Sequence, residues 1–278
     1  MVFFGFLRNA VAQPSSNSST QQEVFSYSNQ TEILNYTREN FREMHFRGKM
    51  CMTNVALKIA NAEYLNENLD GLHALHAKLD AYLQSYDINE GHSGQSYMIL
   101  ERQVYRTIAK EYPCVKSICE IGFNAGHSAL GWLSANPDAK VTMFDLWEHT
   151  YNAKAEEFIR LQTDLHPDRM KIIKGSSLET VKKYHAENPR FRCDVISIDG
   201  GHSYDIAVKD VDNMKFLANQ FFNILLIDDT NCDKTWCVDS TIQEHCKRGT
   251  IDILEGFSLS NNERGISIMT YNRLKSLV

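Results

Sequence analysis

Carboxylates and glycines dominate the residues of this chain that could take part in chemistry, and most of them end short apolar runs. The segment 120–128, EIGFNAGHS, follows one such run and opens a helix-like stretch. Gly122 and Gly126 allow a tight turn that approaches a ligand closely, and the helix after it begins with free N–H groups. The segment is therefore predicted to cradle a nucleotide or nucleoside.

The charge and spacing of this loop indicate which nucleoside it suits. A carboxylate at Glu120 would repel a pyrophosphate, but it could accept from an ammonium or lie near a sulfonium. The G-x-x-x-G spacing of Gly122 and Gly126 differs from the G-x-G-x-x-G of dinucleotide folds and from the P-loop pattern. A cationic nucleoside such as S-adenosylmethionine fits better than NAD or ATP. Glycines at such turns are often only structural, so the loop alone is a weak signal.

Further candidates for nucleoside binding follow the next two apolar runs. Asp145 ends the run 141–144, where a carboxylate can accept both hydroxyls of a ribose. The alternative is an Asp that caps a helix. Leu146 and Trp147 could supply an apolar face for adenine. Ser176 and Ser177 could reach the adenine edge, or simply cap the next helix.

Three carboxylates end two later apolar runs, DVISID and ILLIDD. If these are adjacent strands, Asp199, Asp228 and Asp229 lie close together, and protonation or a hard divalent cation such as Mg²⁺ must relieve their repulsion. A cation would also help a substrate hydroxyl to lose its proton. The alternative is that one of Asp228 and Asp229 caps the next helix while the other faces water.

His202 lies three residues after Asp199, in a turn at the same predicted end of the sheet. A neutral imidazole there could take the proton of the acceptor near neutral pH. A lone histidine in a loop is usually only solvated, so this assignment depends on its acidic neighbours.

After Pro113, apolar runs alternate with amphipathic stretches, which predicts an α/β fold with a mainly parallel sheet covered on both faces. Two final strands with no room for a helix between them predict an antiparallel pair. Ligands in such sheets bind at the carboxyl ends of the strands. The seven predicted strands span 117–121, 140–144, 170–173, 194–198, 223–227, 251–255 and 266–271.

The region before Pro113 divides in two. Residues 1–45 are predicted to form a polar, disordered tail. Residues 46–112 are predicted to form a helical cap, with apolar stripes over 65–83 and 96–110. His73 and His76 lie beside the first stripe and are interpreted as ordinary boundary histidines. Residues 113–278 form the predicted cofactor-binding domain.

Composition limits the classes of partner. The net charge of −6 without a long basic run argues against a dedicated nucleic-acid or membrane surface, so a small molecule is expected and a homodimer is left open. The seven cysteines are scattered, and Cys119 and Cys193, inside apolar runs, are predicted to be buried reduced thiols. No Cys/His spacing suggests a zinc site.

The compartment is predicted to be the cytoplasm, with no stable membrane insertion. The opening apolar segment 1–7 is too short for a spanning helix or a convincing signal sequence. Sequons at Asn17, Asn29 and Asn35 leave a secretory route open, although chance explains them equally well in so polar a stretch.

Over roughly 96–271, these motifs together resemble the class I S-adenosylmethionine-dependent methyltransferases, which implies a Rossmann-like seven-stranded sheet. The order is glycine loop, acidic second strand, D-G-x-H-S-Y, D-D and terminal antiparallel strands. Within the class, the chain is most similar to small-molecule O-methyltransferases of the catechol and macrolide-sugar type. The resemblance implies that Asp199, Asp228 and Asp229 bind a divalent metal such as Mg²⁺ and that His202, with Asp199, is catalytic. The implied cofactor-binding residues are Glu120, Gly122, Phe123, Asn124, Gly126, Ser128, Asp145, Leu146, Trp147, Ser176, Ser177 and Asp199.

One departure bears on the metal. Many relatives read D-G-D-H-S-Y, and this chain has Gly201 in place of the second acid. The leading hypothesis is metal-assisted O-methylation of a hydroxylated small molecule. The alternative is a non-catalytic relative that binds the cofactor and has a regulatory role. A dehydrogenase-like use of the sheet is disfavoured by the glycine spacing, and base methylation by the lack of an N/D-P-P-[YFW] tetrapeptide.

Overall fold

The computed structural model describes residues 69–86, 99–111, 114–259 and 264–272. The predicted tail 1–45 and its three sequons lie outside the described residues. Of the predicted cap 46–112, the structure describes helix α3 (Asp70–Tyr82) and helix α4 (Ile99–Glu111), which match the two predicted apolar stripes. None of the described helices is both long and apolar enough to span a membrane.

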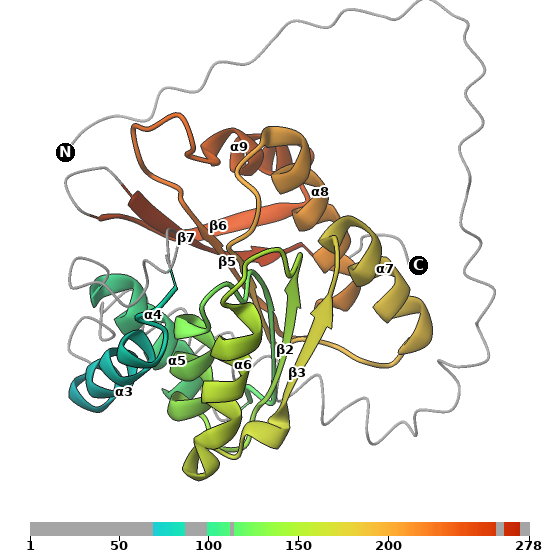
Figure 1. Ribbon diagram of the computed structural model, residues 1–278. Coiled ribbons are helices and arrows are strands. Elements are labelled where there is room, and N and C mark those ends of the chain that lie inside the picture. Colours follow the sequence, from blue (N-terminus) through green and yellow to red (C-terminus); the bar gives the residue numbers. More distant parts are fainter. Residues whose placement is uncertain (1–68, 87–98, 112–113, 260–263, 273–278) are drawn as a thin grey trace, which may run out of the picture. The chain divides into compact units, whose positions relative to one another are not determined.

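The sheet has seven strands in the order β3-β2-β1-β4-β5-β7-β6 (Figure 1). The first five strands pair in parallel, and β7 pairs antiparallel with both β5 and β6. The predicted Rossmann-like α/β class and its antiparallel C-terminal pair are confirmed. The strands are β1 (Ser117–Ile121), β2 (Lys140–Asp145), β3 (Met170–Lys174), β4 (Val195–Ile198), β5 (Ile224–Asp228), β6 (Ile251–Leu259) and β7 (Arg264–Tyr271).

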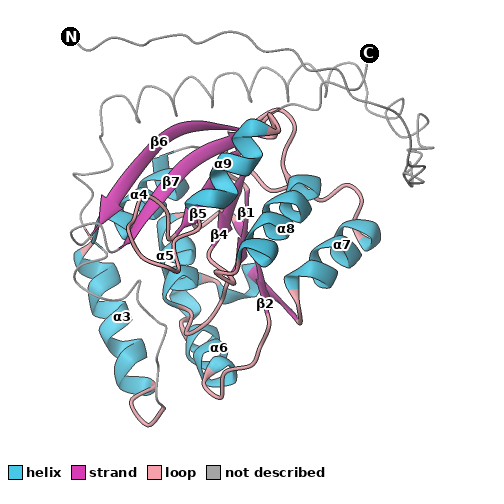
Figure 2. Ribbon diagram, turned by 90° about the horizontal axis from the view of Figure 1, so that it is seen from above, coloured by secondary structure: helices cyan, strands magenta, loops and turns pink. Residues whose placement is uncertain are grey.

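Helices cover both faces of this sheet (Figure 2). On one face, α3, α4, α5 and α6 share a buried apolar cluster that includes Leu79 and Trp132. On the other, α7, α8 and α9 share a second cluster that includes Val181 and Val211. The remaining helices are α5 (His127–Ala135), α6 (Asn152–Leu161), α7 (Ser177–Glu187), α8 (Tyr204–Met214) and α9 (Asp239–Lys247), with short 3₁₀ turns at Thr163–Leu165, Pro167–Arg169 and Lys215–Leu217.

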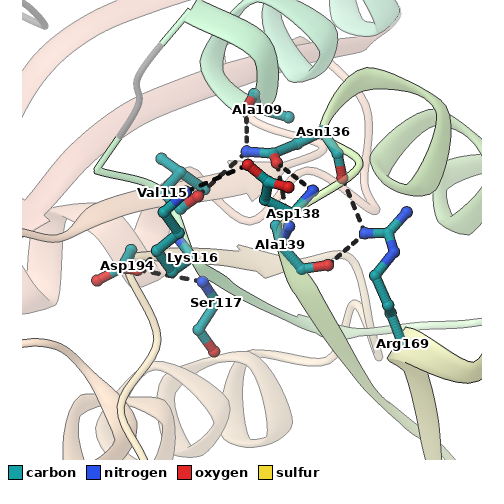
Figure 3. Close-up of polar contacts among 9 residues, drawn as sticks. All are labelled: Ala109, Val115, Lys116, Ser117, Asn136, Asp138, Ala139, Arg169 and Asp194. Carbon is teal, nitrogen blue, oxygen red and sulfur yellow. Dashed lines mark hydrogen bonds and ion pairs between the residues drawn. The ribbon is translucent and has the colours of Figure 1, made fainter.

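The amino end of the sheet is held by one buried amide (Figure 3). The side chain of Asn136 donates to the carbonyls of Ala109 in α4 and Val115 just before β1, at 2.7 and 3.1 Å. Its Oδ1 accepts from the N–H groups of Asp138 and Ala139, both at 3.0 Å. Asn136 therefore ties three segments together at the end of the sheet opposite the glycine loop.

The prediction that Cys119 and Cys193 are reduced thiols is wrong. These two cysteines form a disulfide between β1 and the residue preceding Asp194, with a Cα–Cα distance of 5.8 Å. A second disulfide joins Cys232 to Cys237 after β5, and Cys114 is also disulfide-bonded. Apolar burial favours a reduced thiol and a disulfide alike, and the sequence did not show that β1 lies beside the start of β4.

Candidate functional site

The glycine loop touches the end of β4. Gly122 has a φ of +106°, and a Cβ atom built there would lie 1.9 Å from the carbonyl oxygen of Asp199. Gly126 has a φ of +84°, and its added Cβ would lie 2.7 Å from the side chain of Ile159. Both positions therefore require glycine for conformation and for space. The tight turn predicted at this loop is present.

Glu120 is completely buried beneath the loop. Its Oε2 accepts from the hydroxyl of Ser128 at 2.9 Å and from the indole N–H of Trp132 at 3.1 Å. Its Oε1 is buried without a hydrogen-bond partner among the described residues. Burial, with Asp199 as a second cause, raises the pKa of Glu120 to about 8. A cationic ligand would favour its ionised form.

Asp145 faces the glycine loop. Its Oδ2 accepts from the backbone N–H groups of Phe123 and Asn124, both at 2.9 Å, and its Oδ1 accepts from the N–H of Trp147 at 2.6 Å. The carboxylate therefore holds the loop and the turn after β2 in place. Each carboxylate oxygen can accept more than one hydrogen bond, so ribose binding remains compatible with these contacts.

The side chain of Asn124 points away from Asp145. Its Oδ1 accepts from the hydroxyl of Tyr151 at 2.7 Å, and its carbonyl accepts from Asn152 at 2.8 Å. The start of α6 therefore holds the tip of the loop, where Asn124 has a positive φ of 46°.

The residues predicted for adenine differ in their availability. Leu146 is exposed, whereas the ring of Trp147 stacks on Phe123 and has Nζ of Lys174 3.7 Å from its centroid. The backbone carbonyl of Ser176 accepts from the hydroxyl of Thr180.

Ser177 is directed toward α8. Its hydroxyl donates to Oδ1 of Asp210 at 2.6 Å. Asp210 is buried, its Oδ2 has no hydrogen-bond partner among the described residues, and burial raises its pKa to about 6. Asp210 was not predicted as a site residue, because an acid inside an amphipathic helix carries no local signal.

His202 and Asp229 form a pair at the carboxyl ends of β4 and β5. Nε2 of His202 lies 2.8 Å from Oδ2 of Asp229, and Nη1 of Arg264 donates to the other oxygen, Oδ1, at 2.8 Å. Asp229 is buried, whereas the side chain of His202 is 43% exposed. The hydrogen bond that His202 donates to Asp229 raises the pKa of His202. The imidazole is thus oriented by a buried carboxylate and still accessible to a substrate.

Only part of the predicted metal triad lies in one group. Among the described residues, ligand atoms of Asp199, His202 and Asp229 lie within 4.8 Å of one another, and Asp228 is not in this group. All four residues nevertheless line one small pocket. Two carboxylates and an imidazole suit a divalent cation, but the two oxygens of Asp229 already bind the side chains of His202 and Arg264. The residues therefore fit a metal only if Asp229 exchanges one of these partners for it.

Two residues of this site were missed from the sequence. Glu101 of α4 is 1% exposed, and its Oε2 has no hydrogen-bond partner among the described residues. The sequence did carry a signal for Glu101. This acid lies three residues before Val104 and four residues before Tyr105, on the helix face that is predicted to be buried. Arg264 gave no signal, because an arginine that begins a strand is ordinary.

Comparisons with known proteins identify a methyltransferase domain in this chain. Residues 119–230 match the family model described as a methyltransferase domain. This range contains the glycine loop, Asp145, His202 and the Asp228-Asp229 pair. No match was found among curated proteins.

Solved structures with the same fold include three that cover most of the chain. Cofactor-bound Rv0187 from MTB is 15% identical with a TM-score of 0.60, and covers 76% of this chain and 96% of its own. The SAH-bound methyltransferase PaMTH1 of Podospora anserina is 17% identical with a TM-score of 0.55, covering 79% and 96%. The O-methyltransferase TomG of Streptomyces achromogenes, in complex with SAM, is 14% identical with a TM-score of 0.55, covering 77% and 95%. At these identities the likeness establishes the fold.

Proposed function

We propose that this chain, which carries a methyltransferase domain of the class I S-adenosylmethionine-dependent fold, transfers a methyl group to a hydroxyl oxygen of a small molecule. The observation that carries the proposal is the His202–Asp229 pair, which lies at the end of the sheet where Gly122 contacts Asp199. O-methylation requires a group that removes the acceptor's proton, and an exposed imidazole oriented by a buried carboxylate is suited to that task.

The chain's residues would divide the work as follows. The S-adenosylmethionine cofactor supplies the electrophilic methyl group when it is bound. The glycine loop holds the methionine end, and Asp145, already bonded to the loop, offers its remaining lone pairs to the ribose. Because Nε2 of His202 donates its hydrogen to Oδ2 of Asp229, Nδ1 is the nitrogen that accepts the acceptor's proton. Asp229 stabilises the resulting imidazolium.

The proposal extends to a divalent metal ion beside His202. Asp199 and Asp229 would hold a divalent cation, with Asp228 close by along the chain, and the cation would supply charge stabilisation for the acceptor oxygen. Arg264 would then have to release Oδ1 of Asp229, or His202 its Oδ2. A requirement for Mg²⁺ would appear as loss of turnover in chelator, whereas the His202–Asp229 pair alone predicts turnover that persists.

A second candidate function is favoured by one feature. Gly201 stands where relatives with this motif carry an acid, and a Cβ there would lie 3.0 Å from a methyl carbon of Ile206, which would have to shift slightly to admit a side chain. A non-catalytic protein that binds the cofactor would tolerate this change. It predicts binding of S-adenosylmethionine without transfer to phenols, sugars or carboxylic acids.

Calorimetry and a turnover assay separate these proposals. We expect wild-type protein to bind S-adenosylmethionine and Asp145→Ala to bind it more weakly. Methyl transfer to any member of an acceptor panel would support the enzyme, and binding without transfer would support the regulatory alternative. Wild-type protein that does not bind the cofactor would refute both.

The disulfides bear on the compartment. Disulfides persist mainly where the environment is oxidising. The pairs Cys119–Cys193 and Cys232–Cys237 therefore favour the secretory route over the predicted cytoplasm. Peptide mapping without reductant would detect both linked pairs, and free thiols at all four positions would contradict the assignment. The homodimer that the sequence left open would be checked by light scattering.

A further inference from the structure

We propose that Glu101 of α4 accepts a hydrogen bond from the α-ammonium group of bound S-adenosylmethionine. The inference rests on the proposed function, because it assumes that this cofactor occupies the glycine loop. It assigns a role to a residue outside the matched range 119–230, contributed by a helix that precedes the domain.

The acidic residues that end the central strands face α4. Ser197 of β4 points to this face, since its hydroxyl lies 3.5 Å from that of Tyr105 in α4. Leu226 of β5 belongs to the apolar cluster that α4 shares. Side chains alternate along strands, so Asp199 and Asp228, each two residues further on, return to the same face.

Strand register places these two acids beside the loop. Ile198 pairs with Ile121 of β1 and with Ile227 of β5, so the next row consists of Gly122, Asp199 and Asp228. Glu120, which pairs with Ser197, lies two rows before Gly122 and faces α5, as its bonds to Ser128 and Trp132 establish.

Glu101 adds a further carboxyl group to these acids, from helix α4 instead of from a strand. It lies one helical turn before Tyr105, which stacks on Trp132 of α5, and is 1% exposed. Its Oε2 has no hydrogen-bond partner within the described part of the chain. Burial raises its pKa well above the ordinary range, and the acids that add to this effect are Asp199, Asp229 and Glu120.

The neighbouring cation does not satisfy this carboxyl group. Arg102 lowers the pKa of Glu101, but Nη2 of Arg102 donates to His73 of α3, at 3.0 Å. A buried carboxyl oxygen without a hydrogen-bond partner, such as Oε2 of Glu101, is costly, and the cost is recovered when a cation donates to it. The α-ammonium of S-adenosylmethionine has three donors, whereas its sulfonium has none. Glu101 and Asp199 offer acceptors to two of these donors.

A metal is the less suitable occupant for Glu101. The group of potential ligand atoms that lie within 4.8 Å of one another comprises Asp199, His202 and Asp229, and Glu101 is not among them. The ammonium group, carried into the site by the cofactor, needs only one hydrogen bond from Glu101.

Two ligands isolate the ammonium group. S-adenosylhomocysteine carries it, whereas 5′-methylthioadenosine lacks the whole amino acid but keeps adenosine and sulfur. Calorimetry would measure both ligands on wild-type protein, on Glu101→Gln and on a control, Glu179→Gln, which makes the same change at an exposed position of α7. We expect Glu101→Gln to weaken the binding of S-adenosylhomocysteine by about 10- to 100-fold, which is the effect expected for the loss of a hydrogen bond to a charged group. Binding of 5′-methylthioadenosine should change less than about 3-fold.

Each other outcome overturns the inference. Equal losses for both ligands would assign Glu101 a general structural role, and unchanged affinity for both would leave it no role in binding. Because 5′-methylthioadenosine reports on the rest of the pocket, it also reveals a misfolded variant. If wild-type protein binds neither ligand, the proposed function fails as well. If wild-type binds both and only the selective loss is missing, the proposed function stands.

Discussion

Nε2 of His127 lies 2.7 Å from Oδ1 of Asp80, so the first residue of α5 is bonded to helix α3. His127 directly follows Gly126 and is almost completely buried. A second contact supports the first, because Nε2 of His76, also on α3, donates to the backbone carbonyl of His127 at 2.9 Å. The predicted cap therefore fixes the point at which the glycine loop becomes a helix.

Removing Asp80 should loosen this link. Asp80→Ala leaves the buried imidazole of His127 without its acceptor, and we expect the free energy of unfolding to fall by about 1 kcal/mol. Lys78→Ala, at an exposed position of the same helix, should change it by less than about 0.5 kcal/mol. Urea unfolding would measure both. Equal effects of the two substitutions would contradict a specific Asp80–His127 contact.

His76 should make stability depend on acid pH. Burial, with His127 as the second cause, lowers its pKa from 6.5 to about 3. The unfolded chain therefore binds a proton that the folded protein excludes, so this contribution is complete above about pH 6.5 and is lost as the pH falls from there toward about pH 3. Linkage gives a loss of about 1.4 kcal/mol between about pH 7.5 and about pH 5.5.

The substitution His76→Gln isolates this effect, because an amide can still donate to the carbonyl of His127 but does not titrate. Unfolding of both proteins at the two pH values should show that wild type loses about 1.4 kcal/mol more than the variant. Parallel pH profiles would mean that His76 titrates normally in the folded state.

Gly122 should tolerate no side chain. In Gly122→Ala the new methyl group would meet the carbonyl oxygen of Asp199 at 1.9 Å, at a φ that L-residues rarely adopt. We expect a loss of about 3 kcal/mol or more in stability, together with loss of S-adenosylmethionine binding. Gly71→Ala is the matched control, because no atom lies within 4 Å of its Cβ position in α3. There the same change should stabilise by about 0.5 to 1 kcal/mol. Thermal unfolding and calorimetry would check both variants.

His202 and Asp229 should affect turnover more than cofactor binding. We expect His202→Gln to lower kcat by about 100- to 10,000-fold, the usual contribution of a general base, with S-adenosylmethionine affinity within about 3-fold of wild type. Asp229→Asn should have a smaller effect on kcat, since the imidazole stays but loses the charge that stabilises its protonated form.

The control for this pair is His185→Gln, on α7 at a distance from β4 and β5, which should keep full turnover. A variant at His202 with unchanged kcat would exclude it as the base. Repeating the wild-type assay in chelator tells whether Asp229 also acts as a metal ligand.

The sequence was most informative where reactive side chains directly follow predicted strands. Alternation of apolar runs predicted all seven strands, and the residues that end them predicted Glu120, Asp145, Asp199 and His202 at one edge of the sheet. The pairing of side chains could not be predicted in the same way. Asp228 and Asp229 are adjacent in sequence, yet of the two only Asp229 is paired with His202 in the described part of the chain, and its backbone has a φ of +52°.

Residues contributed from distant segments were the ones that sequence reasoning missed. Glu101 and Arg264 come from α4 and β7, on either side of the matched domain, and reach Asp199 and Asp229 only through packing. The disulfide between Cys119 and Cys193 was missed for the same reason, because its cysteines are 74 residues apart in the sequence. Periodicity describes each element by itself, whereas these contacts depend on which elements become neighbours.

The order of strands also has a consequence for how the protein is made. β7 lies between β5 and β6, so the strand that carries Asp228 has no partner on that side until residues 264–271 have been synthesised. A nascent chain that ends earlier exposes an unpaired edge of β5, which is a site for association with other chains. Arg264, which holds Asp229, arrives with the same strand. The His202–Asp229 pair therefore gains its third partner only when residues 264–271 have been added, and a chain interrupted before residue 264 would carry the glycine loop without Arg264.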